Sequence, residues 1–285
     1  MGISGWSKIL FDSDFRREKE EEYKKLPLTN DFIFFRVMQN EKLCKKLLEV
    51  ILKVKIKKIR YHEVQKFFKK TYMSKGVRLD VYIEDDENTV YDVEMQARTV
   101  RNLPKRSRYY QGLIDVENTR KSTDYINLKR SYVIFICLKD VFDQEKPVYT
   151  FENICVEDGH TRLGDEAVKI FLNASAFEKA EDDDIRAFLS YVYNEIPVNE
   201  FTKEIDEEVK LVRKSDRWRL SYMTLAMKYA EEREIGREEG RIEGRIEGRI
   251  EDHKLSIEKL AKHYMSENKE LTYEEAYKMA EKILK

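Results

Sequence analysis

Apolar and polar residues alternate along two neighbouring segments in the first hundred residues of the chain. In residues 77–83, apolar side chains occupy the odd positions, and polar or aromatic side chains occupy the even positions. Residues 89–96 repeat this alternation, and the acidic stretch 84–88 between them is typical of a turn. A period of two is the pattern of a strand with one buried face. The sequence therefore predicts a β-hairpin.

A different spacing predicts helices on either side of this hairpin. Between Asp31 and Leu52 the apolar residues recur every three or four positions, with a break near Asn40. Residues 103–121 show a similar spacing. Apolar residues at these intervals line one side of a helix. We therefore expect one or two helices before the hairpin and one helix after it.

The longest apolar run predicts a central strand. Residues 132–138 are unbroken apolar and rich in β-branched residues, which suits a strand buried on both faces. Because a helix precedes it, this strand is expected to run parallel to its predecessor through a right-handed crossover. Residues 64–72 are a weaker strand candidate. The predicted order over residues 28–140 is α–β–β–β–α–β, an α/β core, followed by short strands within 147–175 and covering helices within 177–233.

The chain divides into four parts by composition. Every residue from Arg16 to Glu22 is charged, so this run is not expected to pack into a core. We expect a mobile leader, an α/β domain with its covering helices, a repeat helix and a helical hairpin. The corresponding ranges are 1–27, 28–233, 234–252 and 253–285.

Composition narrows the class of protein. Charged residues make up 38% of the 285 residues, and the formal net charge is −1. No uncharged run exceeds eight residues, whereas a membrane-spanning helix needs about 20 apolar residues. We therefore expect a cytoplasmic protein without a membrane segment. The three cysteines form no Cys-x-x-Cys pair, which argues against a disulfide framework or a thiolate metal site.

Positive charge gathers in one segment of the chain. Residues 42–70 contain eleven Lys or Arg and two Glu, a local excess of nine positive charges. Such a patch can bind the phosphates of nucleic acid, and Lys66 and Lys69 are its candidates for contact with DNA. A solvated surface of helix and loop explains the same charges equally well.

The predicted hairpin places two acids side by side. If its turn is centred on Glu87, Asp80 lies directly opposite Glu94, with Cβ atoms about 5 Å apart. Facing like charges are destabilising unless a cation lies between them, and Mg²⁺ commonly takes one or two carboxylates plus a substrate phosphate. Gln96 projects from the same face, where its amide can orient an attacking water. Two alternatives stay open: the acids are ordinary solubilising residues, or Asp92 replaces one of them in a shifted register.

These motifs together resemble a known nuclease family. Three strings carry the resemblance, and they read Arg78-Leu79-Asp80-Val81, Asp92-Val93-Glu94-Met95-Gln96 and Pro104-Lys105-Arg106-Ser107-Arg108-Tyr109-Tyr110-Gln111. With the opening segment 28–34 and the strand 132–138, they resemble the PD-(D/E)XK nuclease family transposases, the Rpn group of recombination-promoting nucleases. The resemblance covers residues 28–140 well and the following helical region more loosely.

The resemblance implies a restriction-endonuclease-like αβββαβ core with a central mixed sheet and a helical carboxy-terminal extension. It also implies Mg²⁺-dependent cleavage of DNA, with Mn²⁺ as a substitute, in recombination, DNA mobility or defence against foreign DNA. Asp80 and Glu94 would bind the metal ion, and Gln96 stands where the usual pattern has Lys. Because Gln carries no positive charge, more of the charge stabilisation falls to the metal ion. A catalytically inactive DNA-binding or oligomerising scaffold is the alternative.

The resemblance also suggests further site residues. Asp31 matches the opening motif and is the candidate for an additional acid, with Glu41 as the alternative. Asp31 equally suits the first turn of a helix without any catalytic role. Arg108, Tyr109 and Gln111, on the helix after the site, are candidates to contact the DNA backbone or to brace the metal ligands. Tyr109 as a core aromatic residue is an equally open interpretation.

A four-residue repeat precedes the carboxy-terminal region. From Gly236 to Glu251 the chain reads Gly-Arg-Glu-Glu once and Gly-Arg-Ile-Glu three times. Four residues turn an α-helix by about 400°, so Ile and Gly form two slowly drifting stripes on opposite sides. Each glycine weakens the helix by roughly 1 kcal/mol relative to alanine. We therefore expect a homo-oligomer that pairs through residues 236–251 and the tail; a flexible charged linker is the alternative.

Overall fold

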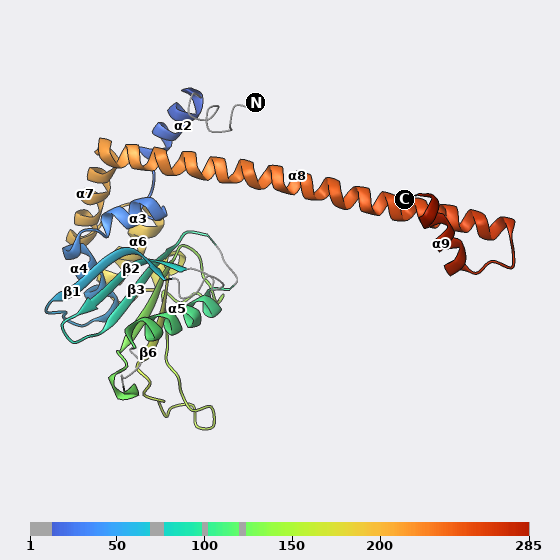
Figure 1. Ribbon diagram of the computed structural model, residues 1–285. Coiled ribbons are helices and arrows are strands. Elements are labelled where there is room, and N and C mark those ends of the chain that lie inside the picture. Colours follow the sequence, from blue (N-terminus) through green and yellow to red (C-terminus); the bar gives the residue numbers. More distant parts are fainter. Residues whose placement is uncertain (1–12, 69–76, 99–101, 120–123, 285) are drawn as a thin grey trace. The chain divides into compact units, whose positions relative to one another are not determined.

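The computed structural model describes residues 13–68, 77–98, 102–119 and 124–284, and it contains a mixed β-sheet. Among these residues the sheet has six strands in the order β1-β2-β3-β4-β6-β5 (Figure 1). The strands are β1 (Ile59–Phe68), β2 (Val77–Asp85), β3 (Val90–Gln96), β4 (Ser131–Cys137), β5 (Val148–Phe151) and β6 (Ala167–Asn173). The strands β3, β4 and β6 run parallel, and the other neighbours are antiparallel. The predicted α/β fold is confirmed.

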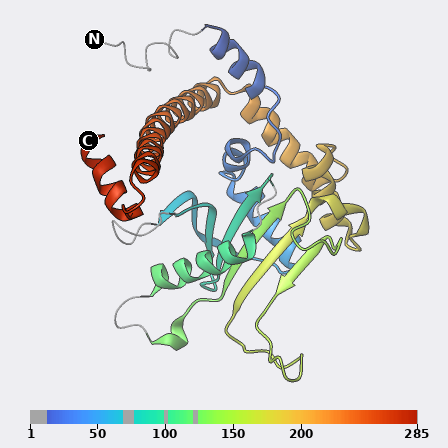
Figure 2. The same ribbon diagram turned by 90° about the vertical axis from the view of Figure 1, so that its right-hand side faces the viewer.

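The described residues form the helices α2 (Ser13–Tyr23), α3 (Asp31–Val37), α4 (Glu41–Leu52), α5 (Leu103–Asn118), α6 (Asp183–Asn194), α7 (Glu200–Lys214), α8 (Asp216–Glu267) and α9 (Tyr273–Ile283), with 3-10 turns at Tyr125–Asn127 and Ala174–Lys179. Helices α3 to α7 cover the sheet (Figures 1 and 2). Helix α5 packs on one face through Leu103, Tyr110 and Ile114. Helices α3, α4, α6 and α7 are grouped on the other side.

The break predicted near Asn40 separates α3 from α4. The side chain of Asn40 accepts hydrogen bonds from the main-chain N–H groups of Lys42 and Leu43 at 3.2 and 3.4 Å. It thereby satisfies donors in the first turn of α4 that have no partner within the helix. Two short helices result, and both turn apolar residues into the core.

A buried aspartate holds the turn of the predicted hairpin. Asp85 Oδ1 accepts from the main-chain N–H groups of Glu87 and Thr89 at 2.9 Å each, and Asp85 Oδ2 accepts from Tyr91 Oη at 2.7 Å. In the ladder that follows, Val81 lies opposite Val93. This is the register expected for a turn centred on Glu87, and it is not shifted.

The other predicted strands are present, but they begin or end at different residues than expected. The strand predicted at 132–138 is β4, which runs parallel to β3 as expected and is buried along almost its whole length. The weak candidate at 64–72 is β1, which begins earlier, at Ile59; residues 69–72 lie outside the described residues. The short strands expected within 147–175 are β5 and β6.

The last residues of the segment 1–27, which was expected to be a mobile leader, pack against α7. Tyr23 is fully buried and its hydroxyl donates to the main-chain carbonyl of Val212. Leu26 is also buried, and its carbonyl accepts from Arg213 Nε at 2.7 Å. The sequence does not reveal this contact, because it depends on only two apolar residues that follow a run of charged residues.

The chain separates into two compact units. One unit runs from Glu20 to Tyr222 and contains the sheet. The other contains Met223–Lys285, in which the whole repeat is helical within α8. In that unit Ile257 and Ala261 of α8 pack against α9, and the side chain of Thr272 caps α9. Within the described part of the chain, no helix combines the length and apolar character needed to cross a membrane.

Candidate active site

Asp80 and Glu94 lie across from each other where the ladder between β2 and β3 ends. The last paired residues of the ladder are Val81 and Val93. One position further, the main-chain N–H of Asp80 donates to Glu94 Oε1 at 2.8 Å, and the N–H of Met95 donates to Asp80 Oδ2 at 3.2 Å. Each carboxylate therefore bonds to the main chain of the opposite strand. The juxtaposition expected from the sequence is present, and the role of the pair stays a prediction.

A third acid lies beside this pair. Asp92 precedes Glu94 by two residues on β3 and is completely buried. Neither of its carboxylate oxygens has a hydrogen-bond donor among the described residues. Burial raises the pKa of Asp92 well above its ordinary range, and the charges of Glu94 and Asp80 raise it further. From the sequence, Asp92 was expected to replace one of the two acids only if the register were shifted. The register is not shifted, and Asp92 still joins the cluster, because residues two apart on a strand share a face.

The pKa of Glu94 is raised as well. Burial, and then the charge of Asp80, raise the pKa of Glu94 to about 8, although the Asp80 N–H and Arg106 act to lower it. Carboxyl groups with raised pKa values that gather at one point are typical of a functional site. A divalent cation would reverse these shifts, because its charge favours the ionised carboxylates.

Gln96 and Arg106 complete the cluster. The amide of Gln96 donates from Nε2 to the carbonyl of Arg98 at 2.8 Å and accepts at Oε1 from Arg106 Nη1 at 3.0 Å. Arg106 Nη2 also lies 3.4 Å from Glu94 Oε2. Arg106 was not among the residues expected from the sequence, although it lies in the family-like string. One feature of the sequence could have identified Arg106: it lies four residues before Tyr110, and this spacing places both side chains on one side of a helix.

The side chains present fit a hard divalent cation. Asp80 and Glu94 offer carboxylate oxygens, and the oxygens of Asp92, which accept no hydrogen bond from the described residues, lie beside them. Mg²⁺ is often held by one or two carboxylates, with water and substrate phosphate as the other ligands. Within the described residues, no group of three or more His, Cys, Asp or Glu side chains is arranged to hold a metal ion. The candidate site therefore depends on a two-carboxylate ligand set.

Neither candidate from the first helices joins that ligand set. Asp31 is the first residue of α3, where it is exposed, and Glu41 is the first residue of α4, also exposed. Both positions suit an acid at a helix amino terminus. Since no group of three acids holds a metal site in the described residues, Asp31 does not complete one with Asp80 and Glu94.

The expected DNA contacts differ in accessibility. Arg108 and Tyr109 are exposed on α5, and Tyr109 is therefore not a core aromatic residue. Gln111 is buried and donates to Ser131 Oγ, so it braces α5 against β4 and has no exposed surface for DNA. Lys66 Nζ lies 4.0 Å from the ring centroid of Tyr82. Lys69 lies outside the described residues.

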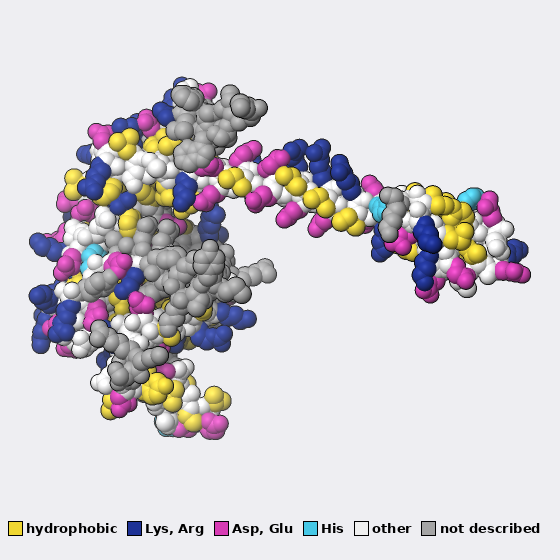
Figure 3. Space-filling model, in the orientation of Figure 1, with side chains coloured by type: hydrophobic (Ala, Val, Ile, Leu, Met, Phe, Trp, Pro, Cys, Tyr) yellow, Lys and Arg dark blue, Asp and Glu magenta, His cyan; other side chains and the backbone are white. Residues whose placement is uncertain are grey.

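Part of the basic segment is neutralised within the fold. Lys46 Nζ lies 3.0 Å from a carboxylate oxygen of Glu204, and Lys53 Nζ lies 2.5 Å from one of Asp182. Other Lys and Arg side chains gather at the edge formed by α4 and β1 (Figure 3). The positive excess predicted for residues 42–70 is therefore smaller on the surface than it is in the sequence.

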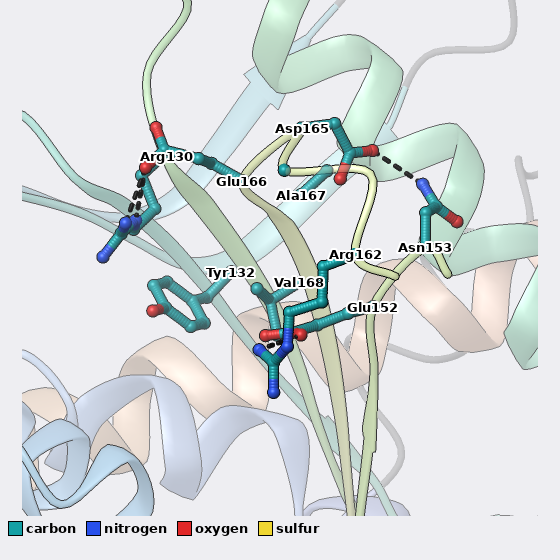
Figure 4. Close-up of a pocket in the computed structure, with 10 residues that line it drawn as sticks. Arg130, Tyr132, Glu152, Asn153, Arg162, Asp165, Glu166, Ala167 and Val168 are labelled. Atoms are coloured by element: carbon teal, nitrogen blue, oxygen red, sulfur yellow. Dashed lines mark hydrogen bonds and ion pairs between the residues drawn. The ribbon is translucent and has the colours of Figure 1, made fainter. Parts of the chain in front are cut away.

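A separate pocket lies at the amino ends of β4 and β6 (Figure 4). Its charged residues pair with one another: Arg130 lies 2.6 Å from Glu166, and Arg162 pairs with Glu152. Glu94 lies beside the opposite half of β4. This pocket is therefore not part of the acid cluster.

A mixed sheet flanked by helices, with an Asp and a Glu-x-Gln motif on neighbouring strands, defines an α/β domain of the PD-(D/E)XK type. The profile of the PD-(D/E)XK nuclease family transposases matches residues 28–242. The chain therefore belongs to this family, as its motifs indicated. Neither the curated proteins nor the solved structures compared with the chain show a significant match.

Proposed function

We propose that this chain is a metal-dependent DNA endonuclease. The observation that supports the proposal is the pairing of Asp80 with Glu94 at the end of the ladder, in a chain of this nuclease family. Mg²⁺ suits the site best, because two carboxylates, water and phosphate oxygens make up its preferred surroundings. Mn²⁺ accepts the same oxygen ligands and should substitute for it.

The proposed reaction is hydrolysis of a phosphodiester bond. Asp80 and Glu94 would hold the cation, which when bound supplies Lewis acidity and positive charge. Gln96 uses its Oε1 to accept from Arg106, and a carbonyl oxygen has a second lone pair that can orient water. The hydrogen bonds at both ends of the amide fix its orientation, so the attacking water would be positioned by a rigid group.

Binding of the DNA backbone would fall to exposed cations and polar groups near the site. Arg108 and Tyr109 on α5 are accessible, and the basic segment 42–70 would contribute further positive charge. Such contacts release counterions from DNA, so binding should weaken steeply as salt rises. We expect this cleavage to serve in recombination, DNA mobility or defence against foreign DNA.

Cleavage of supercoiled plasmid DNA by the full chain in Mg²⁺ tests the proposal. Asp80→Ala and Glu94→Ala should each lower the rate by at least about 100-fold, as expected for loss of a group that holds the catalytic charge. The matched control is Glu87→Ala, an exposed acid in the turn of the same hairpin. Mn²⁺ binding, followed by electron paramagnetic resonance, should weaken in the two site variants and stay unchanged in the control. Cleavage that survives Asp80→Ala contradicts the proposed site.

A DNA-binding scaffold without turnover is the second candidate function. Two observations favour it: position 96 carries Gln instead of Lys, and the described residues contain no three-acid metal group. The plasmid experiment separates the two functions. Retention of DNA without any cleavage in Mg²⁺ or Mn²⁺ would favour the scaffold.

We also propose that the repeat in α8 mediates self-association. Ile242, Ile246 and Ile250 are 48%, 52% and 64% exposed. A Cβ atom built on Gly240, or on the other repeat glycines, would meet no atom within 4 Å. Hydrophobic, acidic and basic side chains alternate along this part of α8 (Figure 3). A second copy would cover the isoleucines with its own glycine stripe and pair Arg with Glu.

A further inference from the structure

Arg106 brings a positive charge to the acid cluster from outside the strand motif. Its Nη1 donates to Gln96 Oε1 at 3.0 Å, and its Nη2 lies 3.4 Å from Glu94 Oε2. One guanidinium therefore contacts both polar residues of the Glu-x-Gln motif. Arg106 lies in the first turn and a half of α5, ten residues after Gln96 in the sequence.

The guanidinium of Arg106 is held in place by its own helix and by β4. Its Nε and Nη2 donate to Tyr110 Oη at 3.2 and 2.7 Å. Its Cζ lies 5.3 Å from the ring centroid of Tyr110 and 5.5 Å from that of Phe135. Because the side chain is fixed by hydrogen bonds and by two rings, little conformational entropy would be lost when it binds a further group.

The side chain of Arg106 is also accessible in part. It is 31% exposed, whereas that of Glu94 is 5% exposed. The guanidinium therefore lies at the boundary between the buried acids and solvent. A phosphate that approached the acids would meet this group, whose positive charge and remaining N–H can act on a phosphate oxygen.

Hydrolysis of a phosphodiester builds negative charge on the phosphate oxygens. The usual pattern of the wider PD-(D/E)XK superfamily has a Lys two residues after the second acid, whereas this chain has Gln96 there, a residue that this group commonly shows. An amide offers a dipole but no net charge. Removal of one preorganised hydrogen-bond donor that is aimed at developing negative charge costs other enzymes about 100- to 1,000-fold in rate.

We propose that Arg106 supplies, from α5, the positive charge that position 96 lacks, and that it binds the scissile phosphate during hydrolysis. The inference rests on the proposed nuclease function. In the reaction, the water oxygen bonds to phosphorus and the bond from phosphorus to the leaving ester oxygen breaks. The proton of the water passes to solvent and the leaving oxygen takes one from solvent, while Arg106 stays protonated throughout.

Kinetics of plasmid cleavage by the full chain in Mg²⁺ test this role. Arg106→Met should lower kcat by about 100-fold or more, with the half-saturating Mg²⁺ concentration changed by less than about threefold. Arg106→Lys should retain more activity than Arg106→Met, because it keeps the charge and loses the planar fork. Lys105→Met, an exposed neighbour on the same helix, is the matched control and should cleave like the unchanged chain.

Rescue by a small cation separates a chemical role from a structural one. Guanidinium ions added at millimolar concentration should restore part of the cleavage by Arg106→Ala and should not accelerate Lys105→Met. The thermal unfolding midpoint of each variant is measured in the same buffer. Loss of activity that is equal in Arg106→Lys and Arg106→Ala, and that guanidinium does not relieve, would make Arg106 a structural brace and overturn the inference.

The same experiment distinguishes failure of this inference from failure of the proposed function. If Asp80→Ala abolishes cleavage while Arg106→Met cleaves like the unchanged chain, the nuclease function stands and the role of Arg106 is refuted. If the unchanged chain does not cleave DNA in either metal, or if Asp80→Ala cleaves normally, the proposed site itself fails, and the inference about Arg106 fails with it.

Discussion

Asp80 and Glu94 are joined by a hydrogen bond in which the main-chain N–H of the first donates to the buried carboxylate of the second at 2.8 Å. This bond and Arg106 both favour the ionised form of Glu94. Burial and the charge of Asp80 outweigh them, so the pKa of Glu94 rises from its ordinary value of 4.5 to about 8. Folding therefore favours the protonated form of this group, and the stability of the fold becomes dependent on pH.

The stability of the metal-free chain should fall as pH rises through the neutral range. The contribution of Glu94 is complete below pH 4.5, where the group is protonated in both states, and it is lost progressively as pH approaches 8. Thermal unfolding in a chelator should show a midpoint lower by about 5 °C or more at pH 8.5 than at pH 5.5. Mg²⁺ should restore most of this difference at pH 8.5. An unfolding midpoint that rises between pH 5.5 and pH 8.5 would contradict the raised pKa of Glu94.

Asp92→Asn should stabilise the metal-free chain at pH 8. Burial raises the pKa of Asp92, so folding disfavours its ionised form; an amide removes this cost, and its N–H groups can donate to Glu94. We expect a gain of about 1–2 kcal/mol in the free energy of unfolding, measured by urea denaturation in a chelator. The gain should shrink as pH falls toward the ordinary value of 3.8, because the acid is then protonated in the unfolded chain as well. Glu87→Gln, in the exposed turn, should show no such dependence on pH.

Asp85→Ala should destabilise the hairpin that carries the acids. The carboxylate of Asp85 accepts from two main-chain N–H groups and from Tyr91 Oη, and it is 5% exposed. Its loss leaves buried donors without a partner, so we expect a loss of about 3 kcal/mol in the free energy of unfolding. Urea denaturation measures the loss, and Asp85→Asn should recover part of it by keeping an oxygen acceptor. A loss no larger than that of Glu87→Ala would show that this carboxylate does not hold the turn.

Replacement of Ile242, Ile246 and Ile250 by Ser should lower the mass of the protein in solution to that of one chain. These side chains are the exposed apolar ridge of the repeat, and Ser removes the surface that a second copy would bury. Sedimentation equilibrium across a concentration series measures the change. Leu211→Ser alters an equally exposed apolar residue outside the repeat and should leave the mass unchanged. A single-chain mass for the unchanged protein would rule out self-association through this helix.

The elements that the sequence predicts well are those with a strong local signal. The hairpin register follows from two alternating segments around a short acidic turn, and the carboxylate of Asp85 enforces it. The break between α3 and α4 follows from Asn40, a residue that favours helix caps. In each case neighbouring residues determine the structure, so no distant contact has to be known.

Distant contacts explain what the sequence does not reveal. The string after the hairpin contains Lys105, Arg106 and Arg108 within four positions. Arg106 meets the acids because of the way α5 is rotated on the sheet. The same rotation buries Gln111, which was expected to contact DNA. Tyr23 likewise meets Val212 across 189 positions. A linear pattern carries no information on such rotations and long-range contacts.

The hydrogen bonds between β2 and β3 at Asp80 and Met95 have a consequence for how the state of the acids can be observed. Both main-chain N–H groups donate to carboxylate oxygens instead of to carbonyls. Anything that draws those oxygens away loosens two individual amide protons while the rest of the sheet keeps its partners. Hydrogen exchange at these two amides should therefore report what the carboxylates bind, and it can be measured without substrate.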